Sequence, residues 1–303
     1  MAPTTSTATG TLAEPTLFAR LIDDAAVFPP AQVALGPAVA AHRRHRGSGY
    51  AALVGPLLVP AAAARELVTL VETAPARPAL AVPTPVAPLA VGVIARPGTD
   101  PQVVTEALAV LGATAAIDVV GVEVGWTPSW RGLDVGGLPL SLEVPRGEAL
   151  VGAVADIAAV ASDSVPVQAK FRTGATPQWP WPDAGELAGF IRAAVDHDLG
   201  FKLTGGLHHA VRGEHPGDSG APDPQHGVLN VVVATRLALN GADAAELVPV
   251  LEERDPDELV PYVVRMSAAD AAVVRAFFTA YGCCDVTDPV GELAGLGLVE
   301  VGA

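Results

Sequence analysis

Short apolar runs recur along the chain, and segments with helical periodicity separate most of them. Continuous runs of Val, Leu, Ile and Ala are typical of strands that are buried on both faces of a parallel sheet. Strands that alternate with helices imply right-handed crossovers. Eight repeats therefore predict a single closed (β/α)8 barrel of the TIM type. The expected strands are residues 25–29, 50–60, 89–97, 119–126, 138–144, 165–173, 199–204 and 228–235.

Helical patterns occupy several of the intervals and the region after the last expected strand. The interval 127–137 is too short for a normal helix. Ser267 and Asp270 have the spacing of a capping sequence. Residues 281–303 are expected to be a short docked tail. The expected helices between strands are residues 61–72, 100–111, 148–161 and 183–196, and the expected extra C-terminal helices are residues 241–252, 257–266 and 267–280.

The two ends of the chain differ in character. Residues 1–15 are rich in Thr, Ala and Pro and lack the basic start and apolar core of a secretory signal, so a disordered tail is expected. Residues 16–303 are then one barrel domain that includes the C-terminal helical segment. The only two cysteines, Cys283 and Cys284, are adjacent and cannot build a disulfide framework, which indicates a reducing cytoplasm. They are interpreted as small buried side chains.

The charge of the chain limits its partners. A formal net charge of −15 disfavours nucleic acids and anionic membranes, because binding to both depends on basic patches. No apolar stretch reaches the ~18 residues of a membrane span without Gly, Pro or charge. The expected partners are therefore a small-molecule substrate and other copies of the same chain as a homo-oligomer, with no nucleic acid and no membrane.

Lysine is almost absent, and its two positions are informative. Lys170 and Lys202 are the only lysines among 18 Lys and Arg residues, and both are at the ends of apolar runs. A buried ammonium is costly unless it is paired or loses its proton. A lysine whose pKa shifts readily is the usual amine nucleophile of Schiff-base chemistry. The alternative is that both lysines form ordinary ion pairs beneath a helix layer.

In a barrel of this kind, chemistry is located where strands end and the following loops begin. The Gly-, Pro- and Asp-rich connector 210–225, which contains Arg212, is expected to be a lid or a ligand-binding loop. The polar residues expected near strand ends are Asp23, Glu123, Glu143, Lys170, Arg172, Lys202, Thr204, His208 and His209, with His226 and Asn230 around the eighth strand.

Two segments around the lysines resemble a known family. Lys170 begins the run Lys-Phe-Arg-Thr-Gly, and Lys202 lies in the run Gly-Phe-Lys-Leu-Thr-Gly-Gly that ends at Gly206. These runs resemble the sixth and seventh strands of the deoxyribose-phosphate aldolase family, over about 40 residues of the chain. The resemblance implies that Lys170 is the Schiff-base nucleophile and that Lys202 lowers its pKa. It also implies that Gly205 and Gly206 form part of a phosphate or carboxylate cradle.

The chain departs from that family at three places. Arg172 stands where the family has a small hydroxyl residue, and His208 and His209 follow the glycine pair. No Asp with the family's surroundings occurs on the fourth expected strand, where Glu123 is the substitute by strand position. Three further segments, residues 21–30, 206–209 and 226–230, are similar to a group of uncharacterised bacterial proteins, a similarity that implies no function.

The residues themselves predict a Schiff-base enzyme of the class I aldolase or lyase type that acts on a small, anionic carbonyl compound. A neutral amine of Lys170 would attack the carbonyl, and the resulting iminium would act as an electron sink for C–C bond cleavage or formation. Repulsion from Lys202 and desolvation would both lower the pKa of Lys170. No cofactor is expected.

The remaining candidates fall into two groups by chemistry. Arginine suits a substrate carboxylate or phosphate, and a carboxylate or imidazole suits proton transfer. The candidates for proton transfer are Glu123, Glu143, His208 and His209. The candidates for substrate binding are Asp23, Arg172, Thr204, Gly205, Gly206, Arg212, His226 and Asn230.

Two other functions compete with this one. In a divalent-metal-dependent lyase or isomerase, the ligands would be His208, His209 and His226 with Glu143 or Glu123. Adjacent strand residues face opposite ways, so His208 and His209 can both be ligands only in a loop. A non-catalytic small-molecule-binding barrel would use the same pocket without a covalent adduct. The chain has no Gly-x-Ser-x-Gly, dinucleotide-binding or P-loop motif.

Overall fold

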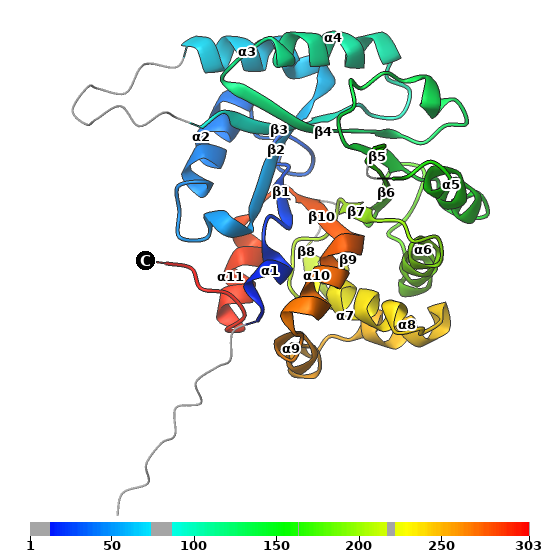
Figure 1. Ribbon diagram of the computed structural model, residues 1–303. Coiled ribbons are helices and arrows are strands. Elements are labelled where there is room, and N and C mark those ends of the chain that lie inside the picture. Colours follow the sequence, from blue (N-terminus) through cyan, green and yellow to red (C-terminus); the bar gives the residue numbers. More distant parts are fainter. Residues whose placement is uncertain (1–12, 74–86, 163, 217–221, 303) are drawn as a thin grey trace, which may run out of the picture.

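Eight parallel strands close into a barrel in the computed structural model, which describes residues 13–73, 87–162, 164–216 and 222–302. Helices surround the barrel, and strands follow one another around it in the order β1-β10-β7-β6-β5-β4-β3-β2 (Figure 1). This arrangement confirms the predicted (β/α)8 barrel. The barrel strands are β1 Ile22–Asp24, β2 Val54–Pro60, β3 Leu89–Ile94, β4 Ile117–Gly125, β5 Leu140–Glu143, β6 Val167–Arg172, β7 Phe201–Thr204 and β10 Phe278–Cys283.

The helices follow most strands and pack against the outside of the barrel. The connection from β4 to β5 has only a 3-10 helix, η3 Trp130–Gly132, as its length predicted. Two further 3-10 helices flank β2, η1 Ala51–Leu53 and η2 Ala61–Ala63. The α-helices are α1 Pro15–Phe18, α2 Leu35–His45, α3 Ala64–Thr73, α4 Pro101–Gly112, α5 Ala149–Ala158, α6 Ala184–Asp196, α7 Val228–Leu239, α8 Ala244–Glu252, α9 Pro256–Val264, α10 Ala268–Phe277 and α11 Thr287–Gly295.

Six of the eight predicted strands are confirmed as β2 to β7, but the first one is wrong. Residues 25–29 form a turn, and the strand β1 lies just before them at Ile22–Asp24. This strand carries two carboxylates, Asp23 and Asp24, both of which are buried. Because acidic residues are depleted in strands, the two aspartates were not included in the first expected strand.

The eighth predicted strand is also wrong, because residues 228–235 are part of helix α7. Every residue from 228 to 235 is buried, since α6, α8, α9 and α10 all pack around this helix. A helix that is buried on all sides has no polar face and therefore no helical period in its sequence. A continuous apolar run of this kind cannot be distinguished from a buried strand by periodicity. His226 and Asn230 therefore lie at the start of a helix and not around a strand.

The strand that closes the barrel is β10, in a region that was expected to be the end of a helix and a docked tail. Helix α10 begins with the predicted capping box of Ser267 and Asp270 and ends at Phe277, and β10 follows without a loop. The expected tail also contains helix α11. Cys283 is fully buried at the end of β10, as interpreted, while Cys284 is half-buried.

Two expected loop regions have more structure than predicted. Residues 1–12 of the expected tail lie outside the described residues, but Ala13 is buried and its N–H donates to the Leu298 carbonyl (3.3 Å). Helix α1 already begins at Pro15. The connector 210–225 contains the antiparallel hairpin of β8 Gly213–Pro216 and β9 Pro222–Gln225.

The alternation of strand side chains positions the two lysines. Phe171 of β6 and Phe201 of β7 pack against Phe190 of α6, with ring centroids 4.8 and 5.3 Å apart. These phenylalanines face the helix layer, so their neighbours Lys170 and Lys202 face the barrel interior. Lys170 and Lys202 are also paired residues in the β6–β7 register. The two amines therefore enter the barrel side by side.

Candidate active site

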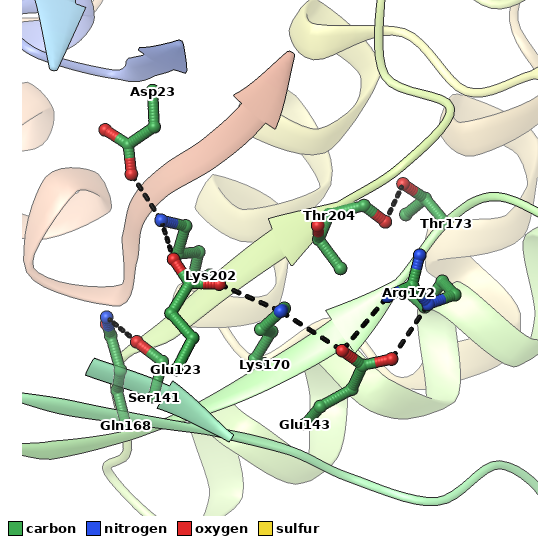
Figure 2. A network of polar contacts seen from close by, with 10 residues as sticks. All are labelled: Asp23, Glu123, Ser141, Glu143, Gln168, Lys170, Arg172, Thr173, Lys202 and Thr204. Carbon is green, nitrogen blue, oxygen red and sulfur yellow. Dashed lines mark hydrogen bonds and ion pairs between the residues drawn. The ribbon is translucent and has the colours of Figure 1, made fainter. Parts of the chain in front are cut away.

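Six charged side chains form one continuous chain of ion pairs across the interior of the barrel (Figure 2). Lys170 Nζ lies 2.8 Å from Glu123 Oε2 and 3.1 Å from Glu143 Oε2. Lys202 contacts the other oxygen of Glu123 and also contacts Asp23. Charges of opposite sign alternate along this charge chain in the order Asp23, Lys202, Glu123, Lys170, Glu143 and Arg172.

Five different strands supply the charge chain, and their register explains why it forms. Glu143 pairs with Lys170 in the β5–β6 register, while Glu123 and Asp23 come from β4 and β1. A glycine on β2 leaves room for the Asp23 carboxylate, since a Cβ at Gly55 would lie 1.9 Å from Asp23 Oδ1. Side chains separated by up to 179 residues in the sequence therefore lie together in the C-terminal half of the barrel; their role as a site remains a prediction.

The centre of the charge chain is buried, and the formal charge of the whole chain of ion pairs is zero. The side chains of Glu123, Lys170 and Lys202 are at most 5% exposed. Three carboxylates face three cations, so each buried charge has at least one partner of opposite sign. A buried charge without such a partner would cost several kcal/mol. The lysines are thus ion-paired, as the alternative interpretation expected. They share the Glu123 carboxylate, and the pairs lie beneath a cavity.

The surroundings shift the acidity of these groups in different directions. Burial opposes ionisation of Glu123, but Lys170 and Lys202 outweigh it and lower the pKa of this carboxyl to about 2. Burial likewise disfavours the Lys202 ammonium, yet Asp23 and Glu123 together raise its pKa. For Asp23, burial raises the pKa and Lys202 offsets only part of this rise. Glu123 has two cations and Asp23 has one, so Asp23 is the weaker acid.

Glu143 links the charge chain to a cavity. Burial would raise its pKa, but Lys170 and Arg172 lower it. Arg172 donates to both oxygens of Glu143, from Nε (2.8 Å) and NH2 (3.2 Å). Glu143 and Arg172 line a cavity of ≈ 600 Å³ over the C-terminal ends of β3 to β6. Lys170 lies directly behind Glu143, one ion pair away from this cavity.

The glycine pair after β7 is required by backbone geometry. Gly205 and Gly206 have φ of +71° and +67°, a region that favours glycine. A Cβ at Gly206 would lie 2.1 Å from the Trp181 ring, and a Cβ at Gly205 would lie 3.3 Å from the Arg172 guanidinium. The pair therefore brings backbone close to Arg172. Thr204 lies at the end of β7 and its carbonyl accepts from Thr173 N–H (2.9 Å). A cradle for an anion remains a prediction.

The two histidines that follow the glycine pair have separate surroundings. His208 Nδ1 lies 3.7 Å from Cys283 Sγ, and burial lowers the pKa of this imidazole. His209 Nδ1 lies 2.6 Å from Glu292, and its ring stacks on His215 at 3.3 Å. The polar contacts of these histidines in the described parts of the chain do not include any group of the charge chain.

The remaining candidates near the hairpin hold one another in place. His226 Nε2 donates to the Pro182 carbonyl and Nδ1 accepts from Arg212, each at 2.9 Å. Burial, with the nearby Arg212, lowers the pKa of His226 to about 4. Asn230 accepts from the Arg212 backbone N–H and donates to the Val250 and Glu253 carbonyls. These contacts stabilise the loops around α7 and involve no group of the charge chain.

The ligands of the metal alternative are not assembled. Glu143 is paired with Lys170 and Arg172, while His208, His209 and His226 are engaged as described. Among the residues that the structure describes, no three His, Cys, Asp or Glu side chains form a group able to hold a metal ion.

Sequence reasoning missed the residues that shape the cavity. They follow β3 to β6 in loops, where no periodic pattern occurs. Tryptophan offered a signal, because the chain has only four and three of them line the cavity. The missed residues with distinctive chemistry are Arg96, Trp126, Trp130, Arg146 and Trp179.

Comparisons of the chain with protein-family models, curated proteins and solved structures find no match. The resemblance to deoxyribose-phosphate aldolases thus remains a prediction that rests on the two lysine segments. Within the described residues, no helix is both long and apolar enough to cross a membrane.

Acidification is expected to weaken the fold between pH 4.5 and about 2, because the pKa of Glu123 falls from 4.5 to about 2 on folding. The unfolded chain binds more protons in this window, so the stability from Glu123 is complete above pH 4.5 and is lost as the pH falls through 2. Glu143 acts in the same direction and Asp23, whose pKa is raised, in the opposite one.

Urea denaturation at a series of acidic pH values measures this dependence. Glu123→Gln is the matched variant, because the amide does not titrate. The variant should lose stability less steeply with falling pH than the wild type does. Equal slopes would show that Glu123 is not ionised in the folded protein.

Proposed function

We propose that the protein is a Schiff-base lyase of the class I aldolase type, which acts on a small anionic carbonyl compound with Lys170 as the nucleophile. The observation that supports this most is the position of Lys170, between Glu123 and Glu143 and one ion pair behind the cavity. Glu123 contacts both lysines. It lies on the fourth strand, where the chain lacks the Asp of the aldolase family. Barrels of this fold are also commonly enzymes.

Deprotonation of Lys170 begins when the anionic group of the substrate binds. A carboxylate or phosphate that pairs with Arg172 takes the place of Glu143 on that guanidinium. Arg172 is one of the two groups that lower the pKa of Glu143, so the exchange makes Glu143 a better proton acceptor. Glu143 then accepts a proton from Lys170 Nζ, and the amine becomes neutral.

The neutral amine attacks the carbonyl carbon, and its proton passes to the carbonyl oxygen to give a carbinolamine. Glu143 returns its proton to the hydroxyl group, which leaves as water, and a cationic iminium remains. The iminium accepts the electron pair of the neighbouring C–C bond, while a hydroxyl proton of the departing fragment moves to Glu143. An aldehyde and an enamine result. Protonation of the enamine by Glu143 and hydrolysis of the iminium by water restore the lysine.

In this mechanism Lys202 is an electrostatic neighbour. It is held as a cation by Asp23 and Glu123, and it keeps the Glu123 carboxyl ionised. Lys202 competes with Lys170 for Glu123 and repels the Lys170 ammonium. Both effects favour loss of a proton from the Lys170 ammonium when the substrate anion has freed Glu143 to accept it.

Reductive trapping tests the proposal. Borohydride is added with members of a panel of small aldehydes and 2-oxo acids, and peptide mass spectrometry locates the adduct. We expect the reduced adduct on Lys170, and none in Lys170→Met. The two lysines and the terminal amine lie far apart in the sequence, so the peptide that carries the adduct identifies the amine. An adduct on Lys202 alone, or none with any carbonyl, would overturn the proposal.

A non-catalytic binding barrel is the second candidate, and one observation favours it. Lys170 is 2% exposed and has two carboxylate partners, an arrangement that also suits a structural ion pair. Such a protein binds anions in the cavity and forms no covalent adduct, so the trapping experiment separates the two functions.

A further inference from the structure

The cavity is larger than a small carbonyl compound requires. Its volume of ≈ 600 Å³ lies within the range of about 300–1,000 Å³ that is typical of pockets for drug-sized ligands. The reacting end of a substrate would occupy only the part next to Glu143 and Arg172. The rest of the cavity extends over the loops that follow β3, β4 and β6, and its lining there indicates what else the ligand carries.

Two indoles form a fixed wall of this cavity. Trp126 Nε1 and Trp130 Nε1 both donate to the same carboxylate oxygen of Asp156, at 2.9 and 2.8 Å. Asp156 is on helix α5, and the shared bond fixes both rings. Their polar atoms are satisfied by the protein, so the parts of the rings that line the cavity are apolar. Trp126 is half-buried and offers the larger part, since Trp130 is 8% exposed and the Arg131 guanidinium lies 4.9 Å from its ring centre.

A third tryptophan lines the cavity in a more exposed position. Trp179 is 47% exposed, and the Arg146 guanidinium lies 5.2 Å from its ring centre. Arg146 is itself held by Glu186, with Nε 3.0 Å and NH2 2.6 Å from Oε1. A fixed cation therefore lies over this indole. The exposed remainder of the ring is suited to stacking against a planar ligand.

The charged side chains of the lining indicate the charge of the ligand. Three arginines and one glutamate line the cavity, and Arg146 is already paired with Glu186. Arg96 lies over the Phe28 ring at 6.0 Å and forms no ion pair with the described residues. The ion-pair partner of Arg172 in the described part of the chain is Glu143, which also pairs with Lys170. Positive charge is therefore in excess in this cavity, which fits an anionic group on the ligand.

We propose that the substrate is a carbonyl compound with an aromatic ring and a carboxylate, the ring lying against Trp126, Trp130 and Trp179 and the carboxylate on Arg172. The carbonyl group in this inference rests on the proposed function. The aromatic ring and the carboxylate are inferred from the cavity lining alone. A sugar acid is the competing ligand, because sugars also stack on indoles.

The test uses acids that have no aldehyde or ketone. Calorimetric titration compares 3-phenylpropanoate, hexanoate and gluconate with the wild type. We expect 3-phenylpropanoate to bind about tenfold more tightly than hexanoate, as one ring-stacking interaction allows, and gluconate to bind no better than hexanoate. Tighter binding of gluconate than of 3-phenylpropanoate, or equal binding of 3-phenylpropanoate and hexanoate, would overturn the inference.

Variants locate the binding. Trp179→Ala should weaken 3-phenylpropanoate about five- to tenfold and leave hexanoate almost unchanged. Tyr262→Ala is the matched control, since Tyr262 is 50% exposed and has the Arg265 guanidinium 5.4 Å from its ring. It should bind both acids as the wild type does. Equal losses in the two variants would contradict the assigned wall.

The outcomes separate this inference from the proposed function. Lys170→Met changes the charge beside Glu143 for both acids alike, so it should keep the preference for 3-phenylpropanoate over hexanoate, and no iminium forms with an acid. Preferred binding of this acid without any trapped adduct would support the cavity and contradict the lyase. Trapping of small aldehydes without preference for the aromatic acid would support the lyase and contradict the ring.

Discussion

Replacing Glu123 with glutamine is expected to lower the free energy of unfolding by about 3–5 kcal/mol. Glu123 is the only carboxylate in the described structure that contacts both lysines, with one oxygen for each. An amide cannot neutralise two buried ammonium groups, so Lys170 and Lys202 would each lose one anionic partner. Urea denaturation at neutral pH measures the loss, which should appear as a lower midpoint with little change in slope.

Two controls make this result specific. Asp196→Asn breaks an ion pair with Arg192 in which the Asp196 side chain is 59% exposed, and it should cost less than about 1 kcal/mol. The double variant Glu123→Gln with Lys170→Met removes one charge of each sign and should recover part of the loss. A change below about 1 kcal/mol in Glu123→Gln would contradict a fully ionised charge chain.

Replacing Lys170 with methionine is expected to lower the proposed C–C lyase activity at least about a thousandfold and to abolish reductive trapping, because the other lysine, Lys202, contacts Asp23 and Glu123 and not Glu143. Lys170→Arg is the matched control. Arginine keeps the positive charge between Glu123 and Glu143 but stays protonated, so it should also be inactive. Activity in Lys170→Arg would show that the cation, and not the amine, is needed.

Lys202→Met should behave differently from both of these variants. Its Lys170 remains available, but Glu123 then pairs with Lys170 alone, so the pH dependence of trapping should move in the alkaline direction. Trapping rates measured across pH in wild type and variant test this. An unshifted profile in a folded variant would mean that Lys202 has only a structural role.

The sequence allowed the two lysines to be placed correctly for a physical reason. Each lies in an apolar run with regular alternation, and helix α6, which connects β6 to β7, begins with a capping box of Asp183 and Glu186. Glu123 and Glu143 could be named from their positions near strand ends. Their shared contacts could not, because strand register decides which side chains meet across a barrel, and one sequence does not reveal it.

The errors have equally local causes. Helix α7 is buried on every side, so its sequence has the appearance of a strand. Strand β10 follows α10 without a loop, and no turn residues mark its start. The cavity depends on the conformations of loops that hold Trp126, Trp130 and Trp179, and loop conformation is not encoded in hydrophobic periodicity.

A crystal structure of the wild type reduced with borohydride in the presence of a trapped carbonyl acid tests the central claim most directly. The account predicts electron density continuous from Lys170 Nζ to the former carbonyl carbon, with the carboxylate of the ligand on Arg172 and Glu143 released from that guanidinium. An adduct on Lys202, or a ligand bound in the cavity while Lys170 keeps both carboxylate partners, would contradict it.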